Sequence, residues 1–227
     1  MPPILTLESP TIQYWRVELS KESLVVGLGD SVTAGDGLRG LDESVTARLA
    51  ERLSAAWVVR ARSGLTSRGI ADLLDRAVAA DDVAAADVVV VSVGVNDLLR
   101  LRSLRTWRRD LGRLLARVTG LTRGTVVLLG MPPVHVFPRL PRPVAVVLGA
   151  RAGRMDRVGV DVARAYGVLH VPLPADLLEH EAAFAADGFH PSEMSHDRLA
   201  GLVVAVLDRR TNRRTDRRTT GEADAVR

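Results

Sequence analysis

The sequence contains no cysteine, which excludes disulfide bonds, thiolate metal sites and a cysteine nucleophile and fits a reducing compartment. The opening MPPILTLESP holds no lysine or arginine, so it lacks the charged start and long apolar run of a secretory signal. The longest apolar runs, such as the one in DVVVVSVGV, are well short of the roughly 18 to 20 residues that a membrane-spanning helix requires. We therefore expect a cytoplasmic protein without stable membrane insertion.

Most of the net positive charge of the chain lies at its C-terminal end. The formal net charge is +4, and residues 208–227 supply +3 of it through seven arginines and four acids. This end contains the repeat RRTN RRTD RRTT, without an apolar residue that could pack on a core. The composition predicts a disordered tail. Basic arms bind phosphates nonspecifically, so weak binding of nucleic acid or acidic surfaces is the functional alternative for this tail.

The remaining chain has the length and the hydrophobic content, 47% overall, of a single domain. Continuous apolar runs alternate with segments of helical period, a pattern typical of a parallel sheet covered by helices on both faces. We expect an N-terminal extension over residues 1–23, an α/β domain over residues 24–207 and the tail over residues 208–227. The predicted strands are 24–28, 57–61, 88–93, 125–130 and 168–171.

The clearest predicted helix covers residues 103–119, where apolar side chains recur at spacings of three and four. Its arginines are most simply a solvated face, and contact with lipid headgroups is the alternative. Five prolines between Pro132 and Pro143 predict an irregular connection after the fourth strand. Loops at that position often shape a pocket.

The segment VVGLGDSVTAGDG, residues 25–37, leads from the first predicted strand into a turn with Asp30 and Ser31. A dinucleotide-binding fingerprint requires glycine where Val32 stands, and a P-loop requires a lysine that is absent. The nucleophile elbow of α/β hydrolases requires glycine where Thr33 stands. Two interpretations remain: Ser31 is a nucleophile at the carboxyl end of the strand, or Asp30 or Ser31 caps the next helix.

Residues at the other strand ends favour the interpretation of Ser31 as a nucleophile. Gly64 follows the second strand, Asn96 follows the third, and Asp187 and His190 lie three apart before the last apolar helix. A serine hydrolase requires a base for the hydroxyl proton, an acid that orients the base, and donors for the oxyanion. Asp187 and His190 can interact within one turn. Asp97, beside Asn96, is interpreted as structural.

The motifs GDSVTAG, Gly64, GVND and DGFH, in that order, resemble the GDSL family of serine esterases and lipases, also called SGNH hydrolases. The resemblance covers residues 24–207 and implies a flavodoxin-like three-layer α/β/α sandwich. It implies that Ser31 is the nucleophile, His190 its base and Asp187 the orienting acid. Ser31, Gly64 and Asn96 would form the oxyanion hole. The implied partner is a small-molecule ester, with no metal or organic cofactor.

The resemblance is weakest before Gly64, where Arg62 stands in place of the asparagine of many family members, so Gly69 is the alternative glycine. Met131 and His135, in the proline-rich connection, are predicted to line the substrate pocket. A carboxylic ester with a short or medium acyl chain is the preferred substrate. A lysophospholipid, a thioester or an acetylated sugar is the alternative on the same scaffold, although the aromatic content of 4% disfavours a sugar site. A noncatalytic protein that binds polyanions through its tail is the alternative of another class.

Overall fold

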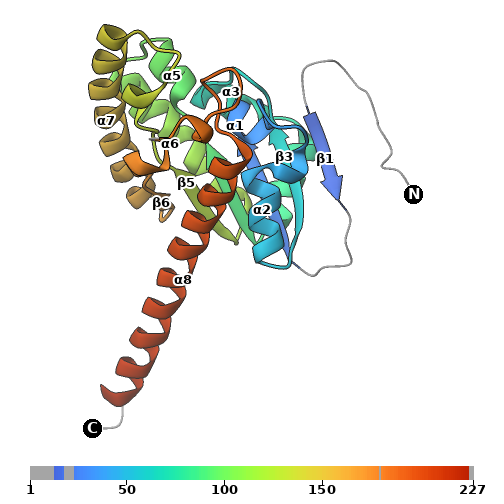
Figure 1. Cartoon of the computed structure of the whole chain (residues 1–227). Helices are drawn as coiled ribbons and strands as arrows, with labels where there is room; N and C mark the ends of the chain where they lie inside the picture. Colours follow the sequence, from blue (N-terminus) through green and yellow to red (C-terminus); the bar gives the residue numbers. More distant parts are fainter. Residues whose placement is uncertain (1–12, 18–22, 179, 225–227) are drawn as a thin grey trace.

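The computed structural model describes residues 13–17, 23–178 and 180–224 (Figure 1). The strands of this part of the chain are β1 (Gln13–Val17), β2 (Leu24–Gly29), β3 (Ala56–Ala61), β4 (Val88–Ser92), β5 (Thr125–Leu129) and β6 (Leu169–Val171). Its α-helices are α1 (Ser31–Ala34), α2 (Val45–Arg52), α3 (Ser67–Leu73), α4 (Ala77–Ala85), α5 (Val95–Leu99), α6 (Leu104–Leu121), α7 (Arg142–Ala165) and α8 (Glu193–Asp224). Short 3-10 helices are η1 (Leu41–Glu43), η2 (Val134–Val136), η3 (Ala175–Leu177) and η4 (Glu181–Ala183).

The strands form one sheet in the order β1-β3-β2-β4-β5-β6. All neighbours from β3 to β6 pair in parallel, which confirms the predicted parallel sheet. In the centre, Val26 of β2 lies opposite Val58 of β3 and Val89 of β4. The chain reverses its direction of progress across the sheet between β2 and β4, and in such sheets ligands bind at the carboxyl ends of the strands beside the reversal.

Helices cover both faces of the sheet, giving the predicted three-layer sandwich. Helices α2 and α8 pack together on one face, and α3, α4, α6 and α7 pack on the other (Figure 1). Strands buried on both faces need apolar side chains throughout, which explains runs such as Val89–Val90–Val91. The predicted helix over residues 103–119 is α6, and it buries the stripe Trp107, Leu111, Leu114, Leu115 and Val118 against the sheet.

Both ends of the chain differ from the expected organisation. Residues 13–17, expected to be an extension outside the domain, form β1 and pair antiparallel with β3 at the sheet edge. Residues 208–224 continue α8 instead of forming a disordered tail, and Figure 1 shows this end of α8 pointing away from the body. Arginine favours helices and the repeat contains no proline, so nothing local stops a helix that the apolar segment before it has started.

The proline-rich connection is irregular over residues 130–141, apart from η2. Helix α7 then begins at Arg142, with Pro143 in its first turn, where a missing N–H costs no hydrogen bond. Among the helices of the described residues, none combines the length and the apolar character needed to cross a bilayer.

Candidate active site

Ser31 lies at the carboxyl end of β2, as the first residue of α1. Asp30, not Ser31, is the helix cap: its Oδ1 accepts a hydrogen bond from the N–H of Val32 at 3.3 Å. The Ser31 hydroxyl is therefore not used for capping. The preceding Gly29 cannot carry a side chain, because a Cβ there would lie 2.3 Å from Thr33 Oγ1 and 2.6 Å from the Ser92 carbonyl oxygen.

Asp187 and His190 form a hydrogen-bonded pair in the turn before α8. Asp187 Oδ2 lies 2.6 Å from His190 Nδ1, and Oδ1 accepts from the backbone N–H groups of Phe189 and His190. Partial burial raises the pKa of Asp187, but the hydrogen bonds from His190 and Phe189 outweigh it and lower the pKa to about 2. The carboxylate thus stays charged and holds Nδ1 of the ring, so Nε2 is the ring nitrogen left for another partner.

Ser31 and His190 line the same cavity. Its other walls are mainly apolar and include Val93, Phe137, Leu177, Leu178, Phe184 and Phe189. All three phenylalanines of the chain meet here: the Phe137 ring lies edge-on to Phe184 and Phe189, with centroids 5.3 and 5.4 Å apart. Phe189 in turn packs edge-on against the His190 ring. Aromatic packing therefore supports the histidine and forms one wall of the cavity.

The other ring nitrogen of His190, Nε2, has a second acidic neighbour. Nε2 lies 3.9 Å from Asp36 Oδ2 and makes no hydrogen bond to Ser31 among the contacts of the described residues. Asp36 itself accepts hydrogen bonds from the Ser63 hydroxyl at 2.7 Å. Asp36 is not among the candidate site residues identified from the sequence. Its approach to His190 joins residues far apart in the chain, so no local pattern in the sequence marks it.

Asn96 and Gly64 extend from the neighbouring strand ends toward the same edge of the sheet. Asn96 Nδ2 donates to the Leu65 carbonyl at 3.0 Å and, more weakly, to Asp30 Oδ2 at 3.5 Å. Gly64 has a φ of +79°, and its N–H donates to no acceptor among the described residues. Gly69 is different, since its N–H donates to the Thr66 hydroxyl that caps α3. Gly64 is thus the glycine with an available donor.

Asp30 is a buried acid that the sequence analysis treated only as a cap. Burial raises the pKa of Asp30 to about 7, against the lowering effect of its hydrogen bonds from Val32 N–H and the Ser92 hydroxyl. Asp97 is also buried, which raises its pKa, and accepts from both Ser67 N–H and Ser67 Oγ. Asp97 therefore orders the start of α3, in line with the structural role expected for it.

Two predicted pocket residues lie elsewhere. Met131 is buried behind the cavity, where it lines a separate small void with Trp107 and Met155. His135 is exposed in η2 and packs against Gly149 of α7, whose Cβ would lie 2.8 Å from His135 Cβ. From the same segment, Pro132 and Phe137 line the cavity instead. The turn of η2 decides which side chains face inward, and the proline pattern does not encode that turn.

The sequence model of the GDSL-like Lipase/Acylhydrolase family matches residues 28–198, which include the turn that carries Ser31, the Asn96 strand end and the Asp187–His190 turn. The chain belongs to this family. The family is named for lipases and acylhydrolases.

A curated relative is the GDSL-like esterase Rv1075c of Mycobacterium tuberculosis, 28% identical over 214 residues. The match covers 86% of this chain and 65% of that protein, so the chain spans slightly less than two thirds of the relative's length. Among solved structures, that of TesA is 28% identical with a TM-score of 0.62, covering 82% of this chain and 97% of that one. Axe2, an acetylxylan esterase from Geobacillus stearothermophilus, has a TM-score of 0.64 at 19% identity, over 82% of this chain and 94% of that one. This last likeness shows the fold alone.

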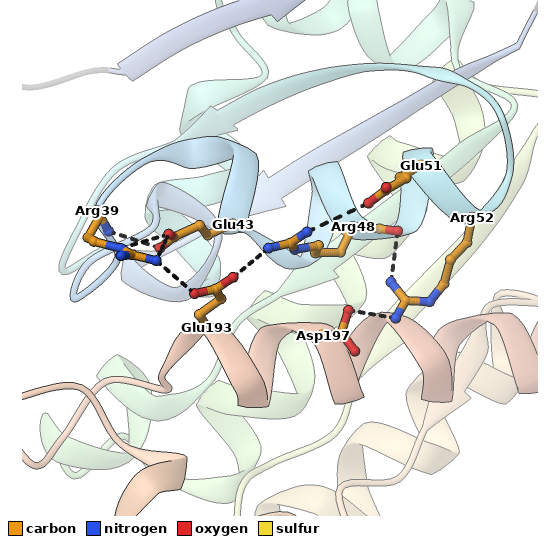
Figure 2. Close-up of polar contacts among 7 residues, drawn as sticks. All are labelled: Arg39, Glu43, Arg48, Glu51, Arg52, Glu193 and Asp197. Atoms are coloured by element: carbon orange, nitrogen blue, oxygen red, sulfur yellow. Dashed lines mark hydrogen bonds and ion pairs between the residues drawn. The ribbon is translucent and has the colours of Figure 1, made fainter.

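In this GDSL-like fold, a network of ion pairs joins the segment after Ser31 to the segment after His190 (Figure 2). Glu193, in the first turn of α8, accepts from Arg39 at 3.1 Å and from Arg48 of α2 at 2.6 Å. One turn later, Asp197 pairs with Arg52 at 2.6 Å. Exposed pairs each contribute little, about 0 to 1 kcal/mol, but these pairs share partners and cross the same interface. They join the start of α8, which follows His190, to α2 and to Arg39 in the loop that follows α1.

Proposed function

We propose that this protein is a serine esterase in which Ser31 is the nucleophile, His190 the general base and Asp187 the orienting acid. The observation that carries the proposal is that Ser31 and His190 line one apolar cavity at the reversal point of the sheet, with Asp187 hydrogen-bonded to the His190 ring. Family membership supports the same reaction class.

In the first step, Ser31 Oγ attacks the carbonyl carbon of the ester while His190 Nε2 takes the hydroxyl proton. The tetrahedral intermediate collapses, the C–O bond to the alcohol breaks, and His190 returns the proton to the departing alcohol. Water then attacks the acyl-enzyme with His190 again as base, and the acid leaves. Catalytic hydrogen bonds often tighten only when substrate is bound, so the serine and histidine need not be bonded in the empty site.

Three donors are proposed for the oxyanion: the N–H of Ser31, the N–H of Gly64 and the side-chain amide of Asn96. Neither backbone N–H donates to an acceptor among the described residues. Asn96 Nδ2 keeps its bond to Leu65 O, while its longer contact with Asp30, at 3.5 Å, is the one that an oxyanion would replace. Asp30 is then a positioning residue, because it orients both the start of α1 and the amide of Asn96.

The cavity supports a carboxylic ester with a short or medium acyl chain. Its walls are aliphatic and aromatic, and the phenylalanine rings close one side. Burial of acyl methylene groups against such walls stabilises the complex by about 0.8 kcal/mol each. A lysophospholipid, a thioester or an acetylated sugar would place a different leaving group outside the same acyl cavity.

The test is hydrolysis of p-nitrophenyl esters of increasing acyl length by the wild type, Ser31→Ala and the control Ser103→Ala. Ser103 caps α6 and is exposed, so its substitution tests the loss of a serine outside the site. We expect saturable activity in the wild type and the control and none in Ser31→Ala. If Ser31→Ala were as active as the wild type, Ser31 would not be the nucleophile. An optimum at short or medium chains would support the substrate class, and no activity on any ester by folded wild type would favour the noncatalytic alternative.

A further inference from the structure

An apolar patch lies exposed where the connection between α5 and α6 meets the start of α7. It consists of Leu99, Leu101, Val144, Val146 and Val147, and we call it the α5–α7 patch. Leu101, Val146 and Val147 are each 67% exposed. Scattered apolar side chains are normal on surfaces, but a group of them that gathers at one place marks an interaction surface.

The two segments of the patch are in contact. Helix α5 packs against α7, and the Arg151 guanidinium of α7 donates a hydrogen bond to the carbonyl of Arg102, next to Leu101. Val146 and Val147 line a shallow groove with Leu104, at the start of α6. The α5–α6 connection and α7 therefore lie side by side on this surface.

Leu101 has an unusual backbone for its residue type. Its φ is +52°, in the left-handed region, which is strained for a residue with a Cβ. Leu101 follows α5 and has the left-handed conformation of a helix C-terminal cap, in which the N–H of Arg102 donates to the Asp97 carbonyl. This cap leaves the Leu101 side chain exposed on the patch.

Arginines surround the patch, and most of them form no ion pair with a described residue. Residues 98–109 and 139–155 contain nine arginines and no aspartate or glutamate. Arg108 and Arg109 pair with Asp161 and Asp110. The exposed arginines Arg100, Arg102, Arg105, Arg142 and Arg154 form no ion pair within the described residues. The patch thus combines exposed apolar side chains with arginines that form no ion pair in the part of the chain that the structure describes.

We propose that the α5–α7 patch docks this protein on the surface of a membrane that contains anionic phospholipids. The leucine and valine side chains would enter the boundary between headgroups and acyl chains, and the guanidinium groups would pair with lipid phosphates. A second copy of this chain fits less well, because a symmetric contact would bring the unpaired arginines of both copies together. The patch is also close to the cavity, since α5 begins at Val95, a cavity wall.

Sedimentation with lipid vesicles tests the proposal on the full chain. One set of vesicles is phosphatidylcholine alone, and the other has equal parts of phosphatidylcholine and phosphatidylglycerol. The variants are Val146→Ser/Val147→Ser, Arg105→Gln/Arg154→Gln and the control Val78→Ser, an exposed valine of α4 outside the patch. Ser31→Ala is included so that binding is measured apart from hydrolysis.

We expect the wild type, Val78→Ser and Ser31→Ala to bind the anionic vesicles alike, and added salt to weaken the binding. The valine double variant should bind about tenfold more weakly, and the arginine double variant should lose much of the preference for anionic vesicles. Circular dichroism and urea midpoints check that the variants are folded. If the wild type and the valine double variant bound equally, the patch would not be the docking surface, and the binding would be assigned to other basic residues. A wild-type dimer that the double valine substitution dissociates, without vesicle binding, would also overturn the proposal in favour of a second copy.

Discussion

His196 should make this fold sensitive to mild acid. It lies in α8 against α2 and is fully buried, at 0% exposed. Its Nδ1 accepts a hydrogen bond from Val45 N–H at 3.0 Å, so the ring is neutral and carries its proton on Nε2. Nε2 has no hydrogen-bond partner among the described residues. Burial, with a smaller effect from His190 and against the effect of Glu43, lowers the pKa of His196 from 6.5 to about 4.

The sign and size of the effect follow from linkage. Below pH 6.5 the unfolded chain binds a proton at His196, while the folded chain resists protonation until about pH 4. Acid therefore favours unfolding through this group, and the pKa difference costs about 2 kcal/mol near pH 5 relative to neutral pH. Asp30 acts in the opposite direction, because its raised pKa lets the folded chain bind a proton first as pH falls through about 7. The total pH dependence is thus a sum, and a variant is needed to isolate His196.

His196→Asn is that variant, since the Asn Oδ1 replaces Nδ1 as the acceptor for Val45 N–H and does not titrate. Urea unfolding near pH 7 and pH 5, followed by the fluorescence of buried Trp107 and by circular dichroism, measures the free energy of unfolding. Between these pH values the wild type should lose about 2 kcal/mol more than His196→Asn. The exposed His180→Asn is the control and should behave as the wild type does. Equal losses in the wild type and His196→Asn would refute the reasoning.

Three further outcomes concern the proposed catalytic residues. Asn96→Ala should lower kcat by about 10² to 10³ with KM nearly unchanged, and a raised KM with normal kcat in steady-state assays would contradict its role as an oxyanion donor. Asp187→Asn should lower kcat by about 10³ or more, because the amide can hold the wrong tautomer of His190; a normal rate across the pH profile would exclude the orienting role. Glu193→Gln, which breaks both ion pairs of Figure 2 at that residue, should lower kcat a few-fold and leave KM alone. Salt should lower the wild-type kcat toward that of Glu193→Gln, and Glu193→Asp should recover part of the loss. If salt changed the kcat of the wild type and of Glu193→Gln equally, the ion pairs would have no role in positioning His190.

The sheet could be predicted because its signal is local in sequence. Apolar runs marked β2 to β6 to within about one residue at most ends, since a parallel strand buried on both faces needs apolar side chains at nearly every position. The same logic found α6 from its apolar period. Edge strand β1 was not predicted because its sequence, QYWRV, contains Gln13 and Arg16 and is not a continuous apolar run. The helical end of α8 was not predicted because the polar composition of residues 208–227 was considered separately from the apolar helix that leads into it.

Part of the candidate site could likewise be predicted from local sequence, and part could not. Ser31, Asn96, Asp187 and His190 were identifiable from sequence, because each follows a strand or precedes a helix in a motif of a known family. Asp187 and His190 interact through three residues of one turn, a contact that spacing alone makes plausible.

Other features depend on which faces meet. The approach of Asp36 to His190, the ion pairs of Glu193 with Arg39 and Arg48, and the burial of His196 against Val45 join residues far apart in the chain. The sequence alone thus determined the strands, the main helix and the residue types of the chemistry, because periodicity and short motifs act between neighbours along the chain. The tertiary structure alone decided the charges, pKa shifts and walls around those residues, because dielectric environment and long-range pairing exist only once the layers have packed.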